Sequence, residues 1–465
     1  GHKVSTEAYK REEPQLRLEL LNAQFELSET CAFQVILLAG GVDGAGKGET
    51  VNLLNEWMDP RLIATNAMAQ ASDEEKERPP MWRFWRALPP KGAIGVFFGS
   101  WYTSPILDRV IGETSAGEFD HLIDDIRHFE RMLADEGALI LKFWFHLSKE
   151  QQRKRLKKLS KDPEQSWRVM DEDWHRFKAY DKFRAVCEHA LTQTNAAYAP
   201  WIVIEGSNER YRHLMVGRTL RDALSERLAN PAKTARTPVT PLANNPEPVD
   251  GVTVLNSLDM SQQLTKSGYK QAFTKLQGKL NVLSRSKKYH KRSIILVFEG
   301  NDAAGKGGAI RRVTRCLDAR FYKVISVAAP TDEEAVQPYL WRFWRHLPRF
   351  GHMSIFDRSW YGRVLVERVE GLCGENDWHR AYGEINAFEE QMARHGIIII
   401  KFWLAITKDE QENRFKEREK SPLKQHKLTP EDWRNREKWN DYAEAVCDVV
   451  DRTSTEIAPW HLIEA

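Results

Sequence analysis

Residues 294–308 read Ile-Ile-Leu-Val-Phe-Glu-Gly-Asn-Asp-Ala-Ala-Gly-Lys-Gly-Gly. The apolar run predicts a buried strand, and the glycines and Lys306 follow with the spacing of a Walker A phosphate-binding loop. Glycines let backbone N–H groups turn toward an anion, the lysine adds a point charge, and the next helix offers its positive end. Where an ATP-using P-loop enzyme carries the Ser or Thr that holds Mg²⁺, this loop has Gly307, and an acid, Asp302, lies inside it.

A second loop of the same kind occurs at residues 41–48, which read Gly-Val-Asp-Gly-Ala-Gly-Lys-Gly. Its lysine precedes that of the other loop by 259 residues (306 − 47), and the same offset matches further segments without a gap through to Glu205 and Glu464. Among these segments are Trp-Arg-Phe-Trp-Arg at 82–86 and 341–345, Ser-Trp-Tyr at 100–102 and 359–361, and Lys-Phe-Trp at 142–144 and 401–403. An ungapped repeat of this length predicts the duplication of a whole domain.

The repeat predicts two domains, at 1–229 and 255–465, joined by a linker at 230–254. The linker carries five prolines among small polar residues, a composition typical of connecting segments. Each domain alternates strand-like apolar runs with helical stretches, which predicts a three-layer α/β/α fold with a parallel sheet. The first copy continues past its last strand with 211–228, which we expect to form a closing helix.

Composition excludes several classes of function. The 465 residues are 42% hydrophobic, with 69 Lys and Arg against 66 Asp and Glu, so any basic site must be local. Five cysteines without C-x-x-C spacing fit a reducing compartment. No signal peptide is recognised, and no apolar stretch reaches the roughly 18 residues of a membrane span. We therefore expect a cytoplasmic protein that binds neither nucleic acid nor a membrane, and homo-oligomerisation is left open.

Residues 353–361 read Met-Ser-Ile-Phe-Asp-Arg-Ser-Trp-Tyr and predict a strand that ends in an acid, Asp357. In P-loop folds, an acid at the carboxyl end of the strand beside the loop holds the metal. We expect Asp357 and Asp302 to bind Mg²⁺, with the second carboxylate replacing the missing hydroxyl. Arg358 is placed to brace a transferring phosphoryl group.

The first copy lacks most of these charges. The equivalents of Asp357 and Arg358 are Phe98 and Gly99, so neither the metal carboxylate nor the arginine is present there. The basic helix after the second loop, with arginines at 311, 312 and 315, has Asn, Leu and Glu at the equivalent positions of the first copy. A basic segment at 414–427 predicts a lid, and its Arg418 is replaced by a leucine in the first copy. We therefore expect the second copy to be catalytic and the first to be degenerate.

These motifs together resemble the polyphosphate kinase 2 family. They are the Gly-Asn-Asp-Ala-Ala-Gly-Lys-Gly loop, Leu-Trp-Arg-Phe-Trp-Arg-His-Leu-Pro at 340–348, Asp-Arg-Ser-Trp-Tyr-Gly-Arg at 357–363 and Arg-Thr-Ser-Thr-Glu-Ile-Ala-Pro-Trp at 452–460. The tandem arrangement with a degenerate first copy is similar to the two-domain members of that family. The resemblance implies a thymidylate-kinase-like P-loop fold, dependence on Mg²⁺, inorganic polyphosphate as donor, AMP as acceptor and ADP as product.

The motif positions and the resemblance define the candidate site. The residues expected at the reaction centre are Asp302, Lys306, Asp357 and Arg358. Those expected to bind the phosphate chain are Gly300, Ala303, Ala304, Gly305, Lys306, Gly307, Arg311, Arg312, Arg418 and Lys427. On the acceptor side we expect Arg363 and Glu367, the latter because it lies where the family keeps an acid.

Three other functions compete with this interpretation. An ATP-dependent nucleoside monophosphate kinase would carry Ser or Thr in place of Gly307. A polyphosphate-dependent nucleoside diphosphate kinase differs only in its acceptor, and the tandem arrangement alone favours AMP. A polyanion-binding module without turnover suits the first copy, but the charges retained in the second copy argue against it for the whole chain.

Overall fold

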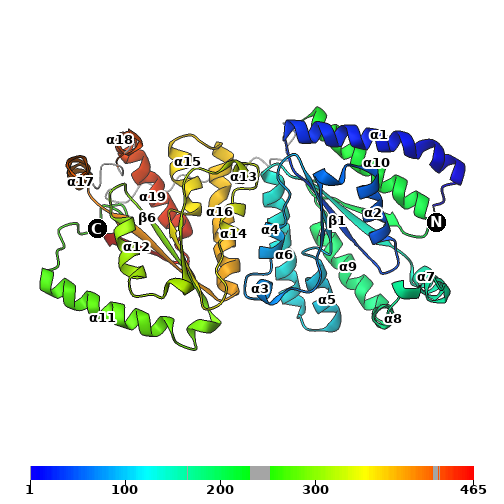
Figure 1. Ribbon diagram of the computed structural model, residues 1–465, viewed down its shortest axis with the longest axis horizontal. Helices are drawn as coiled ribbons and strands as arrows, with labels where there is room; N and C mark the ends of the chain where they lie inside the picture. The colour runs from blue at the N-terminus through cyan, green and yellow to red at the C-terminus, as the bar shows by residue number, and fades with distance from the viewer. Residues whose placement is uncertain (1, 165, 231–251, 423–427, 429) are drawn as a thin grey trace. The chain divides into compact units, whose positions relative to one another are not determined.

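The computed structural model describes residues 2–164, 166–230, 252–422, 428 and 430–465. These residues form two parallel five-stranded sheets, each with helices on both faces (Figure 1). The strand order is β2-β3-β1-β4-β5 in the first sheet and, in the equivalent direction, β7-β8-β6-β9-β10 in the second. The two sheets share one topology, which confirms the predicted α/β class and its duplication.

The first half of the chain contains the strands β1 (Val35–Gly41), β2 (Ile63–Ala67), β3 (Ile94–Phe98), β4 (Leu139–His146) and β5 (Trp201–Glu205). Its helices are α1 (Thr6–Thr30), α2 (Lys47–Trp57), α3 (Asp73–Lys76), α4 (Trp82–Arg86), α5 (Thr103–Ile111), α6 (Ala116–Asp135), α7 (Lys149–Lys161), α8 (Asp171–Lys178), α9 (Tyr180–Thr194) and α10 (Glu209–Ala229). Helix α10 is the closing helix expected at 211–228.

The second half contains the strands β6 (Ser293–Gly300), β7 (Tyr322–Ser326), β8 (Met353–Asp357), β9 (Ile397–Ala405) and β10 (Trp460–Glu464). Its helices are α11 (Lys266–Ser284), α12 (Lys306–Thr314), α13 (Asp332–Ala335), α14 (Trp341–Trp344), α15 (Val366–Val369), α16 (Glu375–Arg394), α17 (Lys408–Lys420), α18 (Pro430–Glu437) and α19 (Trp439–Thr453). A short 3₁₀ helix, η6 (Trp360–Val364), lies between β8 and α15.

The chain forms two compact units. One comprises Gly1–Ala71, Arg83–Thr237 and Thr331–Trp341, and the other comprises Ser72–Trp82, Pro238–Pro330 and Arg342–Ala465. The short segments 72–82 and 331–341 are equivalent at the offset of 259, so each unit takes this segment from the opposite half of the chain. The domain limits at 229 and 255 stay a prediction, and 231–251 of the predicted linker lie outside the described residues.

Each sheet is buried on both faces, as its apolar strands require. In the first unit Val35 and Leu37 of β1 pack with Leu20 of α1 and with Leu220 and Leu224 of α10. In the second, the core around β6 includes Leu296, Phe298, Ile310, Ile355 and Leu404. This packing holds the carboxyl ends of β6 and β8 rigidly side by side, because Phe298 pairs with Asp357 in their parallel register.

The repeated Ser-Trp-Tyr and Lys-Phe-Trp motifs build a buried polar network. The Lys401 ammonium lies 2.8 Å from the Glu389 carboxylate, which also accepts hydrogen bonds from Tyr361 (2.7 Å) and Trp360 (3.0 Å). The first unit repeats this network with Lys142, Glu130, Tyr102 and Trp101. Every charge in it is paired inside the fold, so these motifs position the strands and helices in both copies alike.

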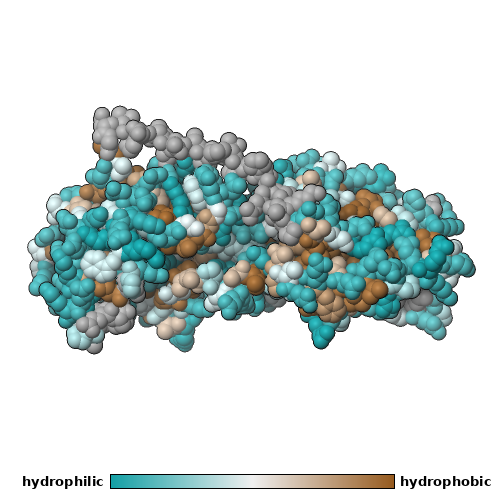
Figure 2. Space-filling model, turned by 90° about the horizontal axis from the view of Figure 1, so that it is seen from above, coloured by the Kyte–Doolittle hydropathy of each residue, from teal (hydrophilic) through white to brown (hydrophobic). Residues whose placement is uncertain are grey.

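The surface seen in Figure 2 is mostly hydrophilic, and its apolar residues are scattered in small groups. Within the described ranges, the structure contains no helix with the length and apolar character needed to cross a membrane. All five cysteines are free thiols.

Candidate active site

The predicted phosphate loop lies at the carboxyl end of β6, between that strand and α12. Gly300 has a φ of 146°, and a Cβ there would lie 2.3 Å from the carbonyl oxygen of Leu404, so only glycine fits. Gly305 (φ 100°) caps α12, which begins at Lys306. Ala303 has a φ of 65°, a left-handed conformation that is uncommon for a residue with a side chain.

The side chain of Lys306 lies back across the loop. Its Nζ donates to the carbonyl oxygens of Gly300 (2.6 Å) and Asn301 (3.2 Å). Burial lowers the pKa of Lys306, and the charges of Asp302, Glu299 and Asp357 oppose that shift. The loop therefore presents an ammonium group surrounded by carboxylates.

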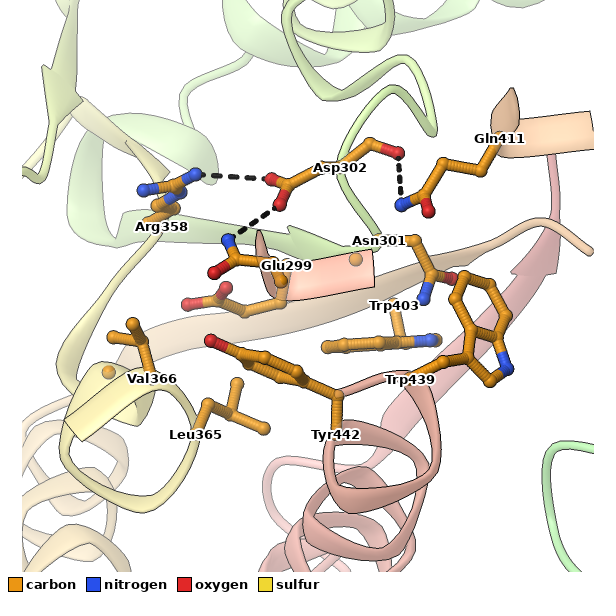
Figure 3. Close-up of a pocket in the computed structure, with 13 residues that line it drawn as sticks. Glu299, Asn301, Asp302, Arg358, Leu365, Val366, Trp403, Gln411, Trp439 and Tyr442 are labelled. Carbon is orange, nitrogen blue, oxygen red and sulfur yellow. Dashed lines mark hydrogen bonds and ion pairs between the residues drawn. The ribbon is translucent and has the colours of Figure 1, made fainter. Parts of the chain in front are cut away.

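Asp302 lies at the centre of the site (Figure 3). Its carboxylate accepts hydrogen bonds from Arg358 Nη2 (3.2 Å) and Asn435 Nδ2 (2.9 Å). Its carbonyl oxygen accepts one from Gln411 Nε2 (3.0 Å). The loop is thus connected to the end of β8, to α17 and to α18.

Asp357 is the last residue of β8, as the sequence predicted, and Arg358 follows it at the same edge of the sheet. Arg358 has a φ of 63° and donates its backbone N–H to the carbonyl oxygen of Phe298 (3.0 Å). A non-glycine residue held in this region stores backbone strain, which is frequent at functional sites. In the first unit the equivalent residue, Gly99, has a φ of 79° and carries no such strain.

Glu299 is a charged residue that sequence reasoning missed. It is buried, with 6% of its surface exposed, and accepts a hydrogen bond from the Ser359 hydroxyl (2.8 Å). Burial raises the pKa of Glu299, while Ser359, Lys306 and Arg358 oppose that rise. The sequence did contain one signal that Glu299 belongs to the site: the equivalent position of the first copy, 259 residues earlier, is Gly40.

A pocket of about 100 Å³ opens beside these groups. One side of it is charged, with Glu299, Asp302 and Arg358. The other side is aromatic and apolar, formed by Trp403, Trp439, Tyr442, Leu365 and Val366 (Figure 3). Such a pocket suits a ligand with a planar ring at one end and phosphate at the other.

The remaining predicted residues lie around this centre. Arg311 is exposed on α12, and Arg312 donates to the Tyr269 hydroxyl of α11 (2.9 Å). Arg418 is partly exposed on α17. Arg363 and Glu367, expected on the acceptor side, form an ion pair with each other (2.8 Å). In the described part of the chain, none of these five residues lines the pocket. Lys427 lies outside the described residues.

The residues present fit a divalent cation of the Mg²⁺ type. Three carboxylates (Glu299, Asp302 and Asp357) act on both Lys306 and Arg358, and a fourth, Asp432, acts on Arg358, so the cluster has a net charge of −2. Within the described ranges, no three His, Cys, Asp or Glu side chains converge on one point. Mg²⁺ is commonly held by one or two carboxylates, with water and substrate phosphates completing its shell. Asp302 and Asp357 suit that mode of binding.

A lysine-bearing loop between a parallel strand and a helix, with an acid at the end of the adjacent strand, defines a P-loop phosphotransferase. The family model for polyphosphate kinase 2 (PPK2) matches residues 3–231 and 263–465. The chain belongs to the polyphosphate kinase 2 family, whose kinases are generally metal-dependent.

Two relatives match almost the full length of this chain. A polyphosphate:AMP phosphotransferase of Pseudomonas aeruginosa is 55% identical over 466 residues, which cover 100% of this chain and 93% of the relative. A polyphosphate:AMP phosphotransferase of Pseudomonas syringae pv. tomato is 52% identical over 469 residues, with the same coverage. A crystal structure from Pseudomonas aeruginosa PA01, named for polyphosphate kinase 2, superposes with a TM-score of 0.90 at 53% identity and covers 100% of this chain and 93% of that one.

Proposed function

We propose that this chain is a polyphosphate:AMP phosphotransferase, which transfers the terminal phosphoryl group of inorganic polyphosphate to AMP and releases ADP. The observation that carries the proposal is the pocket of the second unit, where the phosphate loop and its charges face an aromatic wall. The names of the two relatives at 55% and 52% identity support the same donor and acceptor.

Positioning and charge neutralisation account for most of the catalysis. The phosphate of AMP has a second pKa of roughly 6 and is largely dianionic at neutral pH, so it needs little help from a general base. The loop N–H groups and Lys306 hold the donor phosphate, and Arg358 stabilises charge on the phosphoryl group in transfer. The ring of AMP lies against Trp439 and Tyr442.

Asp302 and Asp357 would hold Mg²⁺, which would supply the positive charge that neutralises the phosphates. Both oxygens of the Asp302 carboxylate already accept hydrogen bonds, from Arg358 and Asn435. A cation held there would compete with Arg358 and Asn435 for the Asp302 carboxylate, and Arg358, when not paired with Asp302, is available to the phosphates.

The second unit carries the reaction, and the first does not. The first unit has Phe98 and Gly99 in place of Asp357 and Arg358. The cytoplasmic location and the absence of nucleic-acid and membrane partners stay predictions from the sequence, and homo-oligomerisation stays open.

The test is ADP formation from AMP and Mg²⁺ with long-chain polyphosphate or ATP as the only donor. We expect ADP from polyphosphate and none above background from ATP. Turnover with ATP but not with polyphosphate would overturn the assignment of polyphosphate as the donor. Turnover of ADP in place of AMP would make the chain a nucleoside diphosphate kinase.

A further inference from the structure

The first unit contains a pocket of its own, of about 410 Å³, at the carboxyl ends of β1 and β3. Its phosphate loop keeps the geometry of the second one. Lys47 Nζ donates to the carbonyl oxygens of Gly41 (2.6 Å) and Val42 (3.2 Å), and Gln152 donates to that of Asp43 (3.1 Å). The equivalent distances in the second unit are 2.6, 3.2 and 3.0 Å. The loop has therefore been retained although the charges of the reaction centre are gone.

The two sites differ in charge. We compare seven equivalent positions, which in the second unit are Glu299, Asp302, Lys306, Asp357, Arg358, Asp432 and Asn435 and in the first are Gly40, Asp43, Lys47, Phe98, Gly99, Asp173 and Arg176. The second set has four acids and two bases, a net charge of −2. The first set has two acids and two bases, so its charges balance. The second set therefore repels a phosphate unless a cation is bound, whereas the first set does not.

Both cations of the first pocket contact Asp43. Arg176 Nε donates to Asp43 (2.8 Å), and Lys47 lies 3.7 Å from the same side chain. Arg176 Nη2 also donates to Asp173 (2.6 Å). The only acid in the first turn of α2, Glu49, lies between two further arginines, Arg155 (3.1 Å) and Arg212 (2.7 Å). Two arginines therefore outnumber the one acid at the N-terminus of α2. This excess of positive charge, at the positive end of the helix dipole, favours an anion at the loop.

The floor of this pocket is aromatic. Its rings belong to Phe98, Tyr102, Trp144, Phe183 and Trp201. Trp144 and Phe183 are nearly parallel (6.2 Å between centroids, 26°), and Trp201 meets Trp144 edge-on. A Cβ at Gly40 would lie 3.3 Å from the Trp144 ring, at the position where the second unit carries Glu299. An aromatic floor beside a loop with two cations suits a planar base that carries a phosphate.

We propose that the first unit binds a nucleoside monophosphate without metal and without phosphoryl transfer, with its phosphate at Lys47 and Arg176 and its base on the aromatic floor. This site is separate from the proposed reaction, which belongs to the second unit. The proposal assigns the duplicated domain a ligand of its own.

The test is isothermal titration of the full-length chain with AMP in EDTA, so that the metal-dependent site of the second unit is not formed. We expect one equivalent of AMP to bind. Lys47→Met and Arg176→Gln should each weaken binding at least about tenfold, the effect of losing a charge-assisted hydrogen bond of roughly 1.5–3 kcal/mol. The matched variant Lys306→Met should leave the titration unchanged. Absence of binding, or weakening by Lys306→Met in place of Lys47→Met, would overturn the proposal.

A second pair of titrations tests the class of ligand. Phe183→Leu, at a partly exposed ring, should weaken AMP binding and leave tripolyphosphate binding unchanged. Equal loss of both, or no loss of AMP binding, would overturn the assignment of a base to the floor. Thermal melting of each variant checks that it is folded. ADP formation in Mg²⁺ reports on the second unit alone, so either proposal can fail while the other holds.

Discussion

Arg358 should lower the stability of the fold through its strained backbone and raise the activity through its guanidinium. Two substitutions at this position separate these two effects. Its φ of 63° is strained for any residue with a Cβ. Arg358→Ala and Arg358→Gly lose the same ion pair with Asp302, which contributes little because the arginine side chain is 52% exposed. Only the glycine variant also relieves the backbone.

The expected difference follows from two opposing terms. A left-handed conformation costs an L-residue roughly 1–2 kcal/mol, and the greater freedom of glycine in the unfolded chain costs roughly 0.4–1 kcal/mol. The glycine variant should therefore be more stable than the alanine variant by about 0.8 kcal/mol, or about 2–3 °C in melting temperature. Both should lose about 10²–10³-fold in the rate of ADP formation, because each lacks the guanidinium.

Differential scanning calorimetry and the polyphosphate-dependent rate measure these effects. An alanine variant as stable as the glycine variant would refute the strain argument, and full activity in either would refute the role of the guanidinium. Gly99→Ala provides the reciprocal control in the first unit. A Cβ there would lie 2.6 Å from the carbonyl oxygen of Met68, so this change should destabilise the chain by more than about 1.5 kcal/mol.

Three further variants test the charged and aromatic sides of the pocket. Glu299→Gln removes one of the four acids of the cluster, so the Mg²⁺ concentration for half-maximal rate should rise about tenfold with little change in the KM for AMP. An unchanged Mg²⁺ requirement would exclude a role for the Glu299 charge. Asn435→Arg places an arginine beside Asp302, as Arg176 lies beside Asp43 in the first unit. Because this arginine would compete with Mg²⁺ for Asp302, the rate should fall at limiting Mg²⁺ and recover in part at high Mg²⁺. A loss that Mg²⁺ does not relieve would contradict competition between the arginine and Mg²⁺. Trp439→Ala should raise the KM for AMP about tenfold through lost ring contact and leave the affinity for polyphosphate unchanged; equal loss for both substrates would show that the ring does not contact AMP.

The fold and the centre of the site were predictable because their signals are local. An apolar run followed by glycines and a lysine specifies a strand, a loop and a helix within 15 residues, and Asp357 follows its strand directly. The internal repeat allowed equivalent positions of the two copies to be compared, and this comparison distinguishes the second copy, with its charged residues, from the first. The same comparison contains the signal for Glu299, which stands at the end of an apolar run and has Gly40 as its equivalent.

Other contacts could not be predicted, because they join distant parts of the chain. Asn435 and Gln411 reach Asp302 across 133 and 109 residues. Arg363 and Glu367 lie four residues apart and pair with each other, a contact that the spacing allows but does not distinguish from a substrate site. The segments 72–82 and 331–341 are equivalent in sequence position, so the repeat alone does not specify which unit each one joins.

The most direct test of the account is the rate of ADP formation from polyphosphate and AMP by Asp357→Asn in the full-length chain at saturating Mg²⁺. The substitution keeps the size of the side chain and removes one metal-binding carboxylate at the end of β8. We predict a loss of about 10³-fold or more. A rate within a few-fold of the unsubstituted chain would contradict the placement of the reaction in the second unit.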